Sequence, residues 1–353
     1  MAAFPAHPDA VTAEWLSATL RREVDAVRWE PIGTGQVGDS VRFHLDCADA
    51  HCPATLAGKF PAADATSRGT ATAFGLYAKE VRFYREIAPK LEVRVPSILA
   101  AELSSDGSEF LLLFEDLGPA RQGDQISGCT LEDARAAIRQ AAAIHGPSWQ
   151  RNDLTGRDWL CLSPEATAQV RALYGQAQAI FRDRYVDTLE SEYMEVCEDL
   201  AAHADLWFGR PQDRNCILHG DFRLDNMLFD IRGGREPVAI LDWQTVAVGN
   251  PLTDVAYFLG CGLGEAMRRR HEDDLLSLYR DAMGEYGVSF EEERFRHNYR
   301  LGALQGVSTA VFSAAFVERT ARGDENFLSM ARGACGLALE HGSIAALKET
   351  ERC

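Results

Sequence analysis

The chain has 353 residues, of which 46% are hydrophobic and 25% are charged. This length exceeds one small domain, and the composition is that of an ordinary soluble globular protein. The 36 lysines and arginines are outnumbered by 53 aspartates and glutamates, which gives a formal net charge of −17. This balance argues against a nucleic-acid-binding protein, because such proteins need a basic face for the phosphates.

Neither a membrane segment nor a secretory leader is visible in the sequence. No apolar run reaches the roughly 18 residues that a membrane span needs. The first ten residues contain no basic start and no long apolar stretch, so we expect no signal peptide and a cytoplasmic location. Nine cysteines at irregular spacing predict reduced thiols rather than a disulfide framework. Cys47, His51 and Cys52 are close together, but a structural zinc site needs four ligands.

The first third of the chain predicts a lobe rich in β-strands. Residues 11–24 have the apolar spacing of a helix, and residues 41–45 alternate as a strand does. Apolar residues at spacings of three and four predict one helix over 71–88, which Pro89 ends. With further strands expected at 55–60, 96–103 and 109–115, we predict an N-terminal helix, a five-stranded sheet and one further helix.

The remainder of the chain predicts helices. A capping signal at Thr130 to Asp133 opens a helix that Gly146-Pro147 is expected to end near residue 145. Helical stretches follow at 164–185 and 188–206, and a second capping signal lies at 289–292. A short region of loops and strands, 216–249, interrupts this pattern. We therefore predict an α+β, bilobal chain with a sheet lobe over 1–117 and a helical lobe over 118–353.

The interrupting region contains the residues with the clearest chemistry. His219-Gly220-Asp221-Phe222-Arg223-Leu224-Asp225-Asn226 is flanked by apolar residues, and Ile240-Leu241-Asp242-Trp243 follows shortly after. An aspartate, an asparagine five residues later and a second aspartate after a strand-turn-strand suit phosphoryl transfer. One carboxylate can orient the hydroxyl that receives the phosphate. The Asn226 amide and the Asp242 carboxylate offer the hard oxygen ligands that Mg²⁺ prefers.

These two motifs resemble the catalytic loop and the metal-binding turn of the aminoglycoside phosphotransferase and choline-kinase-like superfamily. The sequence as a whole is most similar to bacterial ecdysteroid-kinase-like small-molecule kinases. Gly220 stands where protein kinases have arginine, and the run from Asp254 to Phe258 also resembles the small-molecule branch. The resemblance covers roughly 25–260. It implies a protein-kinase-like fold and a transfer of the γ-phosphate of ATP, with Mg²⁺, to a hydroxyl of a small molecule.

The resemblance also assigns roles to individual residues. Asp221 would orient the acceptor hydroxyl and take its proton, while Asn226 and Asp242 would hold the metal. Arg223 would either face the transferred phosphate or form a structural ion pair with a neighbouring aspartate. Asp254 would brace the catalytic loop, and His219 is expected to be a packed loop histidine.

Partners for the nucleotide are found upstream. Lys59, on an apolar strand, is similar in position to the lysine that holds the α- and β-phosphates, and Glu80 to its carboxylate partner, with Glu86 as the competitor. Gly33, Gly35 and Gly38 form a G-x-G-x-x-G run. A strand pattern follows this run, so a glycine-rich hairpin over the phosphates is favoured over a dinucleotide fold.

The expected hinge follows the apolar strand that ends near residue 115. Backbone groups around Glu115 and Leu117 are expected to read the adenine edge, and the acidic side chains need not touch the base.

Other functions stay open. A protein kinase is the near alternative, but the chain lacks an Ala-Pro-Glu sequence and a long segment between Asp242 and the next helix. A catalytically silent nucleotide-binding protein is the second alternative, and a homodimer is an open additional role. The acceptor stays open among aminoglycosides, choline-like compounds and steroid-like or lipid-like alcohols.

Overall fold

The computed structural model of the protein describes residues 4–33, 38–210 and 213–350. The chain divides into two compact units. Unit 1 comprises Met1–Lys90, Arg94–Ala120 and Asp230–Val246, and unit 2 comprises Leu91–Val93, Arg121–Phe229 and Ala247–Cys353.

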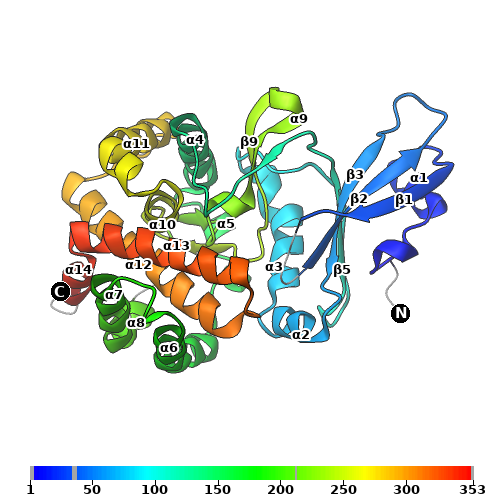
Figure 1. Ribbon diagram of the computed structural model, residues 1–353. Coiled ribbons are helices and arrows are strands. Elements are labelled where there is room, and N and C mark those ends of the chain that lie inside the picture. Colours follow the sequence, from blue (N-terminus) through cyan, green and yellow to red (C-terminus); the bar gives the residue numbers. More distant parts are fainter. Residues whose placement is uncertain (1–3, 34–37, 211–212, 351–353) are drawn as a thin grey trace. The chain divides into compact units, whose positions relative to one another are not determined.

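Unit 1 is built on an antiparallel sheet of five strands in the order β1-β2-β3-β5-β4 (Figure 1). The strands are β1 (Ala26–Pro31), β2 (Gly38–Asp46), β3 (Thr55–Pro61), β4 (Ile98–Leu103) and β5 (Phe110–Glu115). The helical segments are a 3-10 turn at Pro8–Ala10, α1 (Ala13–Leu20), α2 (Ala65–Ala73), α3 (Leu76–Arg82), a π-helical turn at Phe83–Ile87 and a 3-10 turn at Ala88–Lys90. The predicted five-stranded sheet is confirmed.

Alternation along β2 buries one face of this sheet, whereas β5 is buried on both faces. Val41, Phe43 and Leu45 of β2 pack with Leu16 of α1 in one hydrophobic cluster. On the helical side, Tyr77 of α3 stacks on Phe110 with ring centroids 4.4 Å apart. Every residue from Phe110 to Phe114 in β5 is buried, because side chains of both parities meet a packed layer.

The single helix predicted over 71–88 is wrong. The structure has α2 and α3 there, followed by the π-helical turn. Gly75 lies between the two helices with φ +66°, a left-handed conformation that glycine adopts without steric cost. The heptad-like apolar spacing continues across this break, so the sequence pattern predicts one uninterrupted helix.

The segment Asp230–Val246 returns to unit 1 through several specific contacts. It contains the short α9 (Ile231–Gly234) and β9 (Glu236–Ile240). The Arg232 N–H donates to the Leu117 carbonyl at 2.9 Å, and the Ile240 N–H donates to the Arg94 carbonyl at 2.9 Å. The Trp243 ring stacks on Phe83 with centroids 3.8 Å apart and an interplanar angle of 6°.

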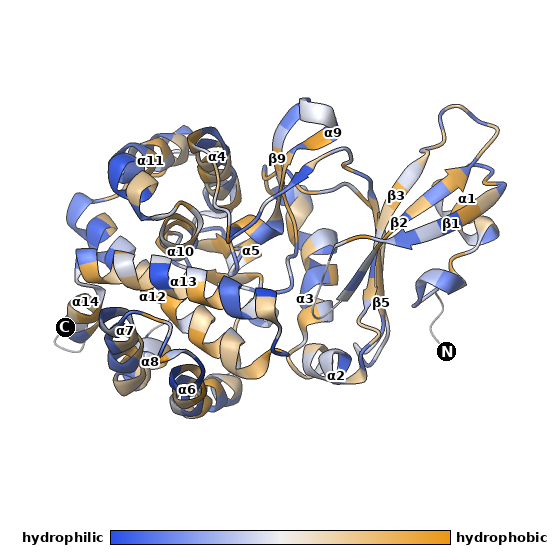
Figure 2. Cartoon of the chain, viewed as in Figure 1, coloured by the Kyte–Doolittle hydropathy of each residue, from blue (hydrophilic) through white to orange (hydrophobic). Residues whose placement is uncertain are grey.

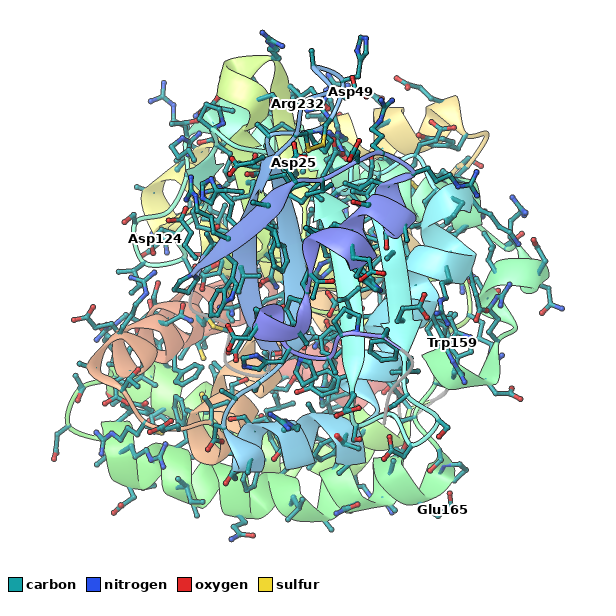
Figure 3. The ribbon with its side chains drawn as sticks, turned by 90° about the vertical axis from the view of Figure 1, so that its right-hand side faces the viewer. Asp25, Asp49, Asp124, Trp159, Glu165 and Arg232 are labelled. Carbon is teal, nitrogen blue, oxygen red and sulfur yellow. A yellow bond between two sulfur atoms is a disulfide. The ribbon has the colours of Figure 1, made fainter. Side chains whose placement is uncertain are left out.

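A disulfide links Cys47 and Cys52 near Asp49, where Figure 3 shows the sulfur–sulfur bond. The prediction of reduced thiols throughout is therefore wrong at this pair. The two cysteines flank the turn between β2 and β3, and the antiparallel pairing of these strands brings them together. This pairing also removes the metal interpretation of Cys47, His51 and Cys52.

Unit 2 consists mainly of helices (Figure 1). They are α4 (Leu131–Ser148), α5 (Asn152–Thr155), α6 (Pro164–Tyr185), α7 (Ser191–Ala202), α8 (Ala204–Gly209), α10 (Leu252–Gly262), α11 (Glu265–Glu285), α12 (Glu292–Phe316), α13 (Ala321–His341) and α14 (Ser343–Glu349), with 3-10 turns at Asp158–Leu160 and Leu224–Asn226. Its strands are β6 (Arg121–Gln122), β7 (Cys216–Leu218), β8 (Met227–Asp230) and β10 (Ala247–Gly249). Figure 2 shows hydrophilic and hydrophobic residues mixed along helices such as α11, as amphipathic helices require.

Helix α10 lies at the centre of this packing because α12 and α13 both approach its backbone closely. A Cβ atom at Gly302 of α12 would lie 2.3 Å from the Leu252 carbonyl oxygen, and one at Gly333 of α13 would lie 2.2 Å from the Gly260 oxygen. Only glycine fits at both positions. All residues of α10 except Thr253 are buried, which fixes the position of this helix.

Two of the predicted helix ends are wrong. Helix α4 begins with the predicted capping box at Thr130 but continues through Gly146-Pro147 to Ser148. Pro147 is tolerated in the last turn because the Ala143 carbonyl, which its missing N–H leaves free, accepts from the Glu92 N–H at 3.2 Å. Helix α12 starts at Glu292, capped by Glu291 rather than by Ser289, since the Glu291 carboxylate accepts two backbone N–H groups.

Within the described residues, no helix combines the length and apolarity that crossing a membrane requires.

Candidate active site

The loop 219–226 of unit 2, called the catalytic loop after the motif that it resembles, starts at the end of a short buried strand. Strand β7 pairs with β10, with Ile217 opposite Val248, and the loop 219–226 runs from it into a 3-10 turn. Apolar residues before and within the loop are buried, including Leu218, Phe222 and Leu224. The polar side chains between them are therefore held on a fixed backbone.

Asp254 of α10 fixes the first part of this backbone. Its carboxylate is 1% exposed and accepts from the His219 N–H at 2.7 Å and from the Gly220 N–H at 3.0 Å. The buried His145 ring lies 3.3 Å from the same carboxylate and 2.8 Å from the Tyr279 hydroxyl. The Gly220 φ of +82° lets the chain turn directly after these bonds, toward Asp221.

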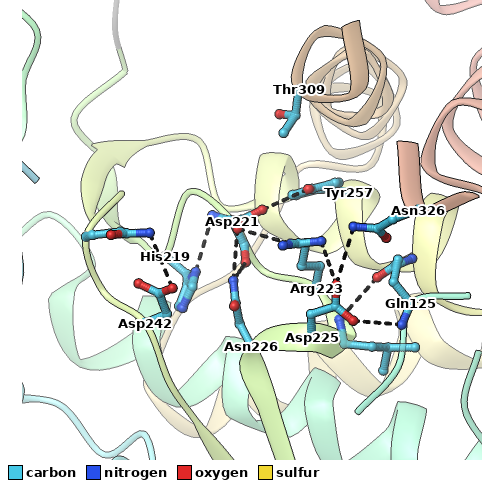
Figure 4. Close-up of polar contacts among 12 residues, drawn as sticks. Gln125, His219, Asp221, Arg223, Asp225, Asn226, Asp242, Tyr257, Thr309 and Asn326 are labelled. Atoms are coloured by element: carbon cyan, nitrogen blue, oxygen red, sulfur yellow. Dashed lines mark hydrogen bonds and ion pairs between the residues drawn. The ribbon is translucent and has the colours of Figure 1, made fainter. Parts of the chain in front are cut away.

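The Asp221 carboxylate has a partner on each oxygen (Figure 4). Oδ2 accepts from Arg223 Nε at 3.1 Å and from Asn226 Nδ2 at 2.9 Å. Oδ1 accepts from the Tyr257 hydroxyl of α10 at 2.8 Å. The side chain remains 23% exposed, so a ligand can still reach it.

These partners keep Asp221 ionised. Burial by itself raises the pKa of this carboxyl, but the Arg223 cation, His219 and the hydrogen bonds from Tyr257 and Asn226 outweigh it and hold the pKa below its ordinary value. Burial lowers the pKa of Arg223, and the Asp221 charge more than reverses this effect, so the guanidinium stays charged. A charged carboxylate beside a charged guanidinium can accept a proton from a substrate hydroxyl and attract a phosphate.

Sequence reasoning missed the role of Asp225 in ordering this loop. Asp225 Oδ2 accepts from Arg223 Nη1 at 2.8 Å, and Oδ1 accepts from the Gln125 N–H at 3.0 Å. Arg223 therefore bridges two aspartates in unit 2, as in the predicted structural ion pair (Figure 4). Its Nη2 group forms no bond to any residue in the described part of the chain, so one edge of the guanidinium is left for a ligand.

A second group of predicted residues meets in unit 1. Lys59 Nζ lies 2.9 and 2.8 Å from the two oxygens of Glu80 and 3.0 Å from Asp242 Oδ1. Glu80 lies in α3, and Glu86 falls in the following π-helical turn. The structure thus brings together three residues, of which Lys59 and Asp242 are 183 positions apart in the sequence.

The electrostatics of this cluster favour a permanently charged lysine. Burial lowers the pKa of Lys59, but the carboxylates of Asp242 and Glu80 overcome this effect and raise it above the ordinary value. Burial raises the pKa of the Glu80 carboxyl, against the attraction of the Lys59 ammonium. Glu80 also accepts from the Trp243 N–H at 3.4 Å, so the lysine is held by a carboxylate that is itself fixed.

Asp242 lies in a sharp turn. Its φ of +61° is rare for a residue with a side chain, although aspartate and asparagine tolerate it best. Stacking of Trp243 on Phe83 holds the turn in place. A left-handed residue that the surrounding packing maintains is typical of functional sites.

The glycine-rich run joins β1 and β2, which pair as an antiparallel hairpin with Pro31 opposite Val41. A strand follows Gly38 rather than a helix. A Cβ atom at Gly38 would lie 3.1 Å from the Phe60 carbonyl oxygen and 3.3 Å from Lys59 Cε, so glycine lets the hairpin pass close to the lysine. Gly33 has φ +74°, and Gly35 lies outside the described residues.

Side-chain contacts in unit 1 fully engage Glu115. Its Oε1 accepts from Arg94 Nη1, from the Ser97 N–H and from Ser97 Oγ, each at 2.8 Å, and Arg232 contacts Oε2. Burial raises the pKa of this carboxyl, but Arg94 and Ser97 lower it to about 2. At the buried Leu117 the carbonyl accepts from Arg232, whereas its N–H donates to no partner within the described residues.

The predicted site residues therefore form two preorganised groups, one in each unit. Unit 2 holds Asp221, Arg223 and Asn226, and unit 1 holds Lys59, Glu80 and Asp242 together with Gly33, Gly38, Glu115 and Leu117. The two predicted metal ligands, Asn226 and Asp242, belong to different units.

Comparison with known sequences identifies relatives over parts of the chain. Acyl-CoA dehydrogenase family member 11 of Gallus gallus is 32% identical over 122 residues, which are 29% of this chain and 15% of that protein. The Homo sapiens protein of the same name is 48% identical over 82 residues, or 21% of this chain and 10% of that protein. The chain thus spans well under a fifth of the length of these relatives.

Comparison with solved structures identifies the fold. A structure described as a putative aminoglycoside phosphotransferase from Ralstonia eutropha JMP134 matches with a TM-score of 0.52, 19% identity and coverage of 93% of this chain and 98% of that chain. Choline kinase from Cryptosporidium parvum Iowa II matches with a TM-score of 0.56, 10% identity and coverage of 90% and 89%. The α+β protein-kinase-like fold predicted from the sequence is confirmed.

The model of a protein family matches residues 41–287 of this chain. The matched region includes Lys59, Glu80, the catalytic loop and Asp242. The resemblance inferred from the two motifs is therefore confirmed. The chain belongs to the ecdysteroid kinase-like family.

Proposed function

We propose that the protein transfers the γ-phosphate of ATP, with Mg²⁺, to a hydroxyl group of a small molecule. The observation that carries this proposal is the ionised Asp221 carboxylate, held on a fixed loop by Arg223 and Asn226 while it remains partly exposed. A carboxylate in this state can orient a hydroxyl and accept its proton. Family membership supports the same conclusion.

The chemistry of the proposed donors fits a magnesium ion. Asn226 Nδ2 donates to the Asp221 carbonyl and carboxylate, each at 2.9 Å, so its amide oxygen is turned away from both. That oxygen accepts no hydrogen bond within the described residues. Asp242 Oδ2 has only a long contact of 3.3 Å with Gln244 Nε2 in the described part of unit 1. Asn226 and Asp242 therefore each offer an oxygen to Mg²⁺, which would neutralise charge on the phosphates.

The nucleotide would be held by unit 1. The Lys59 ammonium, fixed by Glu80, supplies a charge for the α- and β-phosphates. The hairpin from Gly33 through Gly35 to Gly38 would supply backbone N–H groups to the phosphates. The Leu117 N–H and backbone groups at Glu115 are proposed to meet the adenine edge, because the Glu115 side chain is already engaged.

In the transfer itself, the acceptor oxygen would bond to the γ-phosphorus as the bond to ADP breaks, and the hydroxyl proton would pass to Asp221. The free edge of Arg223 is proposed to face the transferred phosphate. Such transfers depend mainly on positioning and on electrostatic stabilisation. We propose that helices following residue 250 bind the acceptor.

An ATP-consumption screen tests this function. Purified protein with Mg-ATP is assayed against panels of aminoglycosides, choline-like amines, steroid-like alcohols and hydroxy-lipids, with Asp221→Asn and the exposed-residue control Asp281→Asn alongside. We expect Asp221→Asn to keep the parent affinity for Mg-ATP and to lose turnover by about 10²–10⁴. Equal turnover in the parent and in Asp221→Asn would overturn the assignment of the base. If no acceptor is phosphorylated although Mg-ATP binds, a silent nucleotide-binding protein is the better description.

A further inference from the structure

Helix α10 contacts the catalytic loop with two side chains one turn apart. Asp254 holds the loop backbone through the N–H groups of His219 and Gly220. Tyr257 holds the carboxylate of Asp221 with its hydroxyl, at 2.8 Å. Residues three apart on a helix lie on the same face, so one rigid surface contacts both the backbone and the functional group of the loop.

The Tyr257 ring has little freedom to move. The residue is fully buried, and α10 is packed against α12 at the level of the ring. A Cβ atom at Gly306 of α12 would lie 3.2 Å from Tyr257 Cδ2, so the ring packs directly against the α12 backbone at this glycine. The hydroxyl therefore reaches the Asp221 carboxylate from a fixed position.

The lone pairs of the carboxylate show what this contact can do. Each carboxylate oxygen can accept about two hydrogen bonds. Oδ2 is filled by Arg223 and Asn226, whereas Oδ1 accepts from Tyr257 alone among the described residues. One acceptor direction, on Oδ1, is therefore left for a substrate hydroxyl.

We propose that Tyr257 is a positioning residue that acts through Asp221. This proposal rests on the proposed function, since it assumes that Asp221 receives the acceptor hydroxyl. By holding Oδ1, the phenol stops the carboxylate from rotating about Cβ–Cγ and directs the remaining lone pair of Oδ1 at the acceptor oxygen. Tyr257 forms no bond to the acceptor or the nucleotide.

The test removes only the hydroxyl. Tyr257→Phe keeps the ring in its buried site, and Tyr185→Phe is a matched control, because the buried Tyr185 also donates to an aspartate, Asp324, at 2.7 Å in a different part of unit 2. Turnover is measured as ADP release from Mg-ATP with water as the acceptor, and affinity as the Kd for Mg-ATP. We expect ADP release to fall about 10- to 100-fold in Tyr257→Phe with the Kd within twofold of the parent, because small misplacement of a reacting group has effects of this size. Tyr185→Phe should keep both values.

A second measurement does not depend on activity. In protein labelled with ¹³C at the aspartate carboxyl carbons, the Asp221 signal is identified by its loss in Asp221→Asn. We expect this signal to shift in Tyr257→Phe and to stay in place in Tyr185→Phe. An unchanged Asp221 signal in Tyr257→Phe would overturn the proposal, as would turnover equal to that of the parent or an equal loss of turnover and of Mg-ATP affinity. A parent protein that binds no Mg-ATP would instead refute the proposed function, and the carboxyl signal would still decide whether Tyr257 holds Asp221.

Discussion

Replacing Lys59 by methionine tests the charge balance of the cluster in unit 1. The substitution keeps most of the apolar stem and removes the cation that lies between two carboxylates, at 2.8 Å from Glu80 and 3.0 Å from Asp242. Removing one partner of a buried ion pair costs about 3–5 kcal/mol, because the other charge is left uncompensated. The Glu80 side chain is 2% exposed and cannot hydrate, whereas that of Asp242 is 32% exposed and can turn toward water. We therefore expect a loss near the lower limit, about 3 kcal/mol.

The complementary substitution should cost less. In Glu80→Gln the Lys59 ammonium keeps Asp242 as a partner, so the expected loss is about 1.5–3 kcal/mol, the range for a hydrogen bond to a charged group. Lys348→Met, at an exposed position of α14, should change stability by no more than about 0.5 kcal/mol. The free energy of unfolding is measured from urea titrations by circular dichroism. A Lys59→Met loss below about 1 kcal/mol, or one smaller than that of Glu80→Gln, would refute the reasoning.

Three further outcomes are expected. Asp242→Asn should fold normally, because asparagine tolerates a φ of +61°. This variant should lose the magnesium-dependent part of the ATP-induced rise in melting temperature, which Asp281→Asn should keep. An unchanged magnesium effect in Asp242→Asn would remove Asp242 from the metal site. Glu115 has its pKa lowered to about 2 in the folded protein, so its stabilising effect is present above the unfolded value of 4.5 and is lost as the pH falls toward 2. Acid titration of the unfolding free energy should therefore show a decline of about 2 kcal/mol after solvent screening that Glu115→Gln lacks, and parallel curves would contradict it. Gly333→Ala should destabilise the protein by about 1–3 kcal/mol, because its Cβ would lie 2.2 Å from the Gly260 oxygen. Gly284→Ala, with open space around it in α11, should be neutral or stabilising. Equal urea midpoints for the two variants would contradict the close approach of α13 to α10.

Local patterns in the sequence were sufficient to predict the fold class and to locate the loop from His219 to Asn226. Alternation in β2 and the apolar run of β5 predict the sheet, because strands that bury one or both faces need those residues at those positions. The motif from His219 to Asn226 predicts the loop, since the residue types and their order are what phosphoryl transfer requires. The glycine-rich run, followed by a strand, predicts the β1–β2 hairpin.

Contacts between distant segments were decided only by the tertiary structure. The return of Asp230–Val246 to unit 1 brings Asp242 to Lys59 across 183 residues, and it depends on the Arg232, Ile240 and Trp243 contacts, which leave no local signature. The break at Gly75 and the extension of α4 past Pro147 also depend on packing and on a distant hydrogen-bond donor, which outweigh local propensity. From the sequence alone, Tyr257 is expected to be an ordinary packed residue of a buried helix. Its hydroxyl acquires a partner only because Asp254, one turn earlier, draws the catalytic loop against the same face of α10.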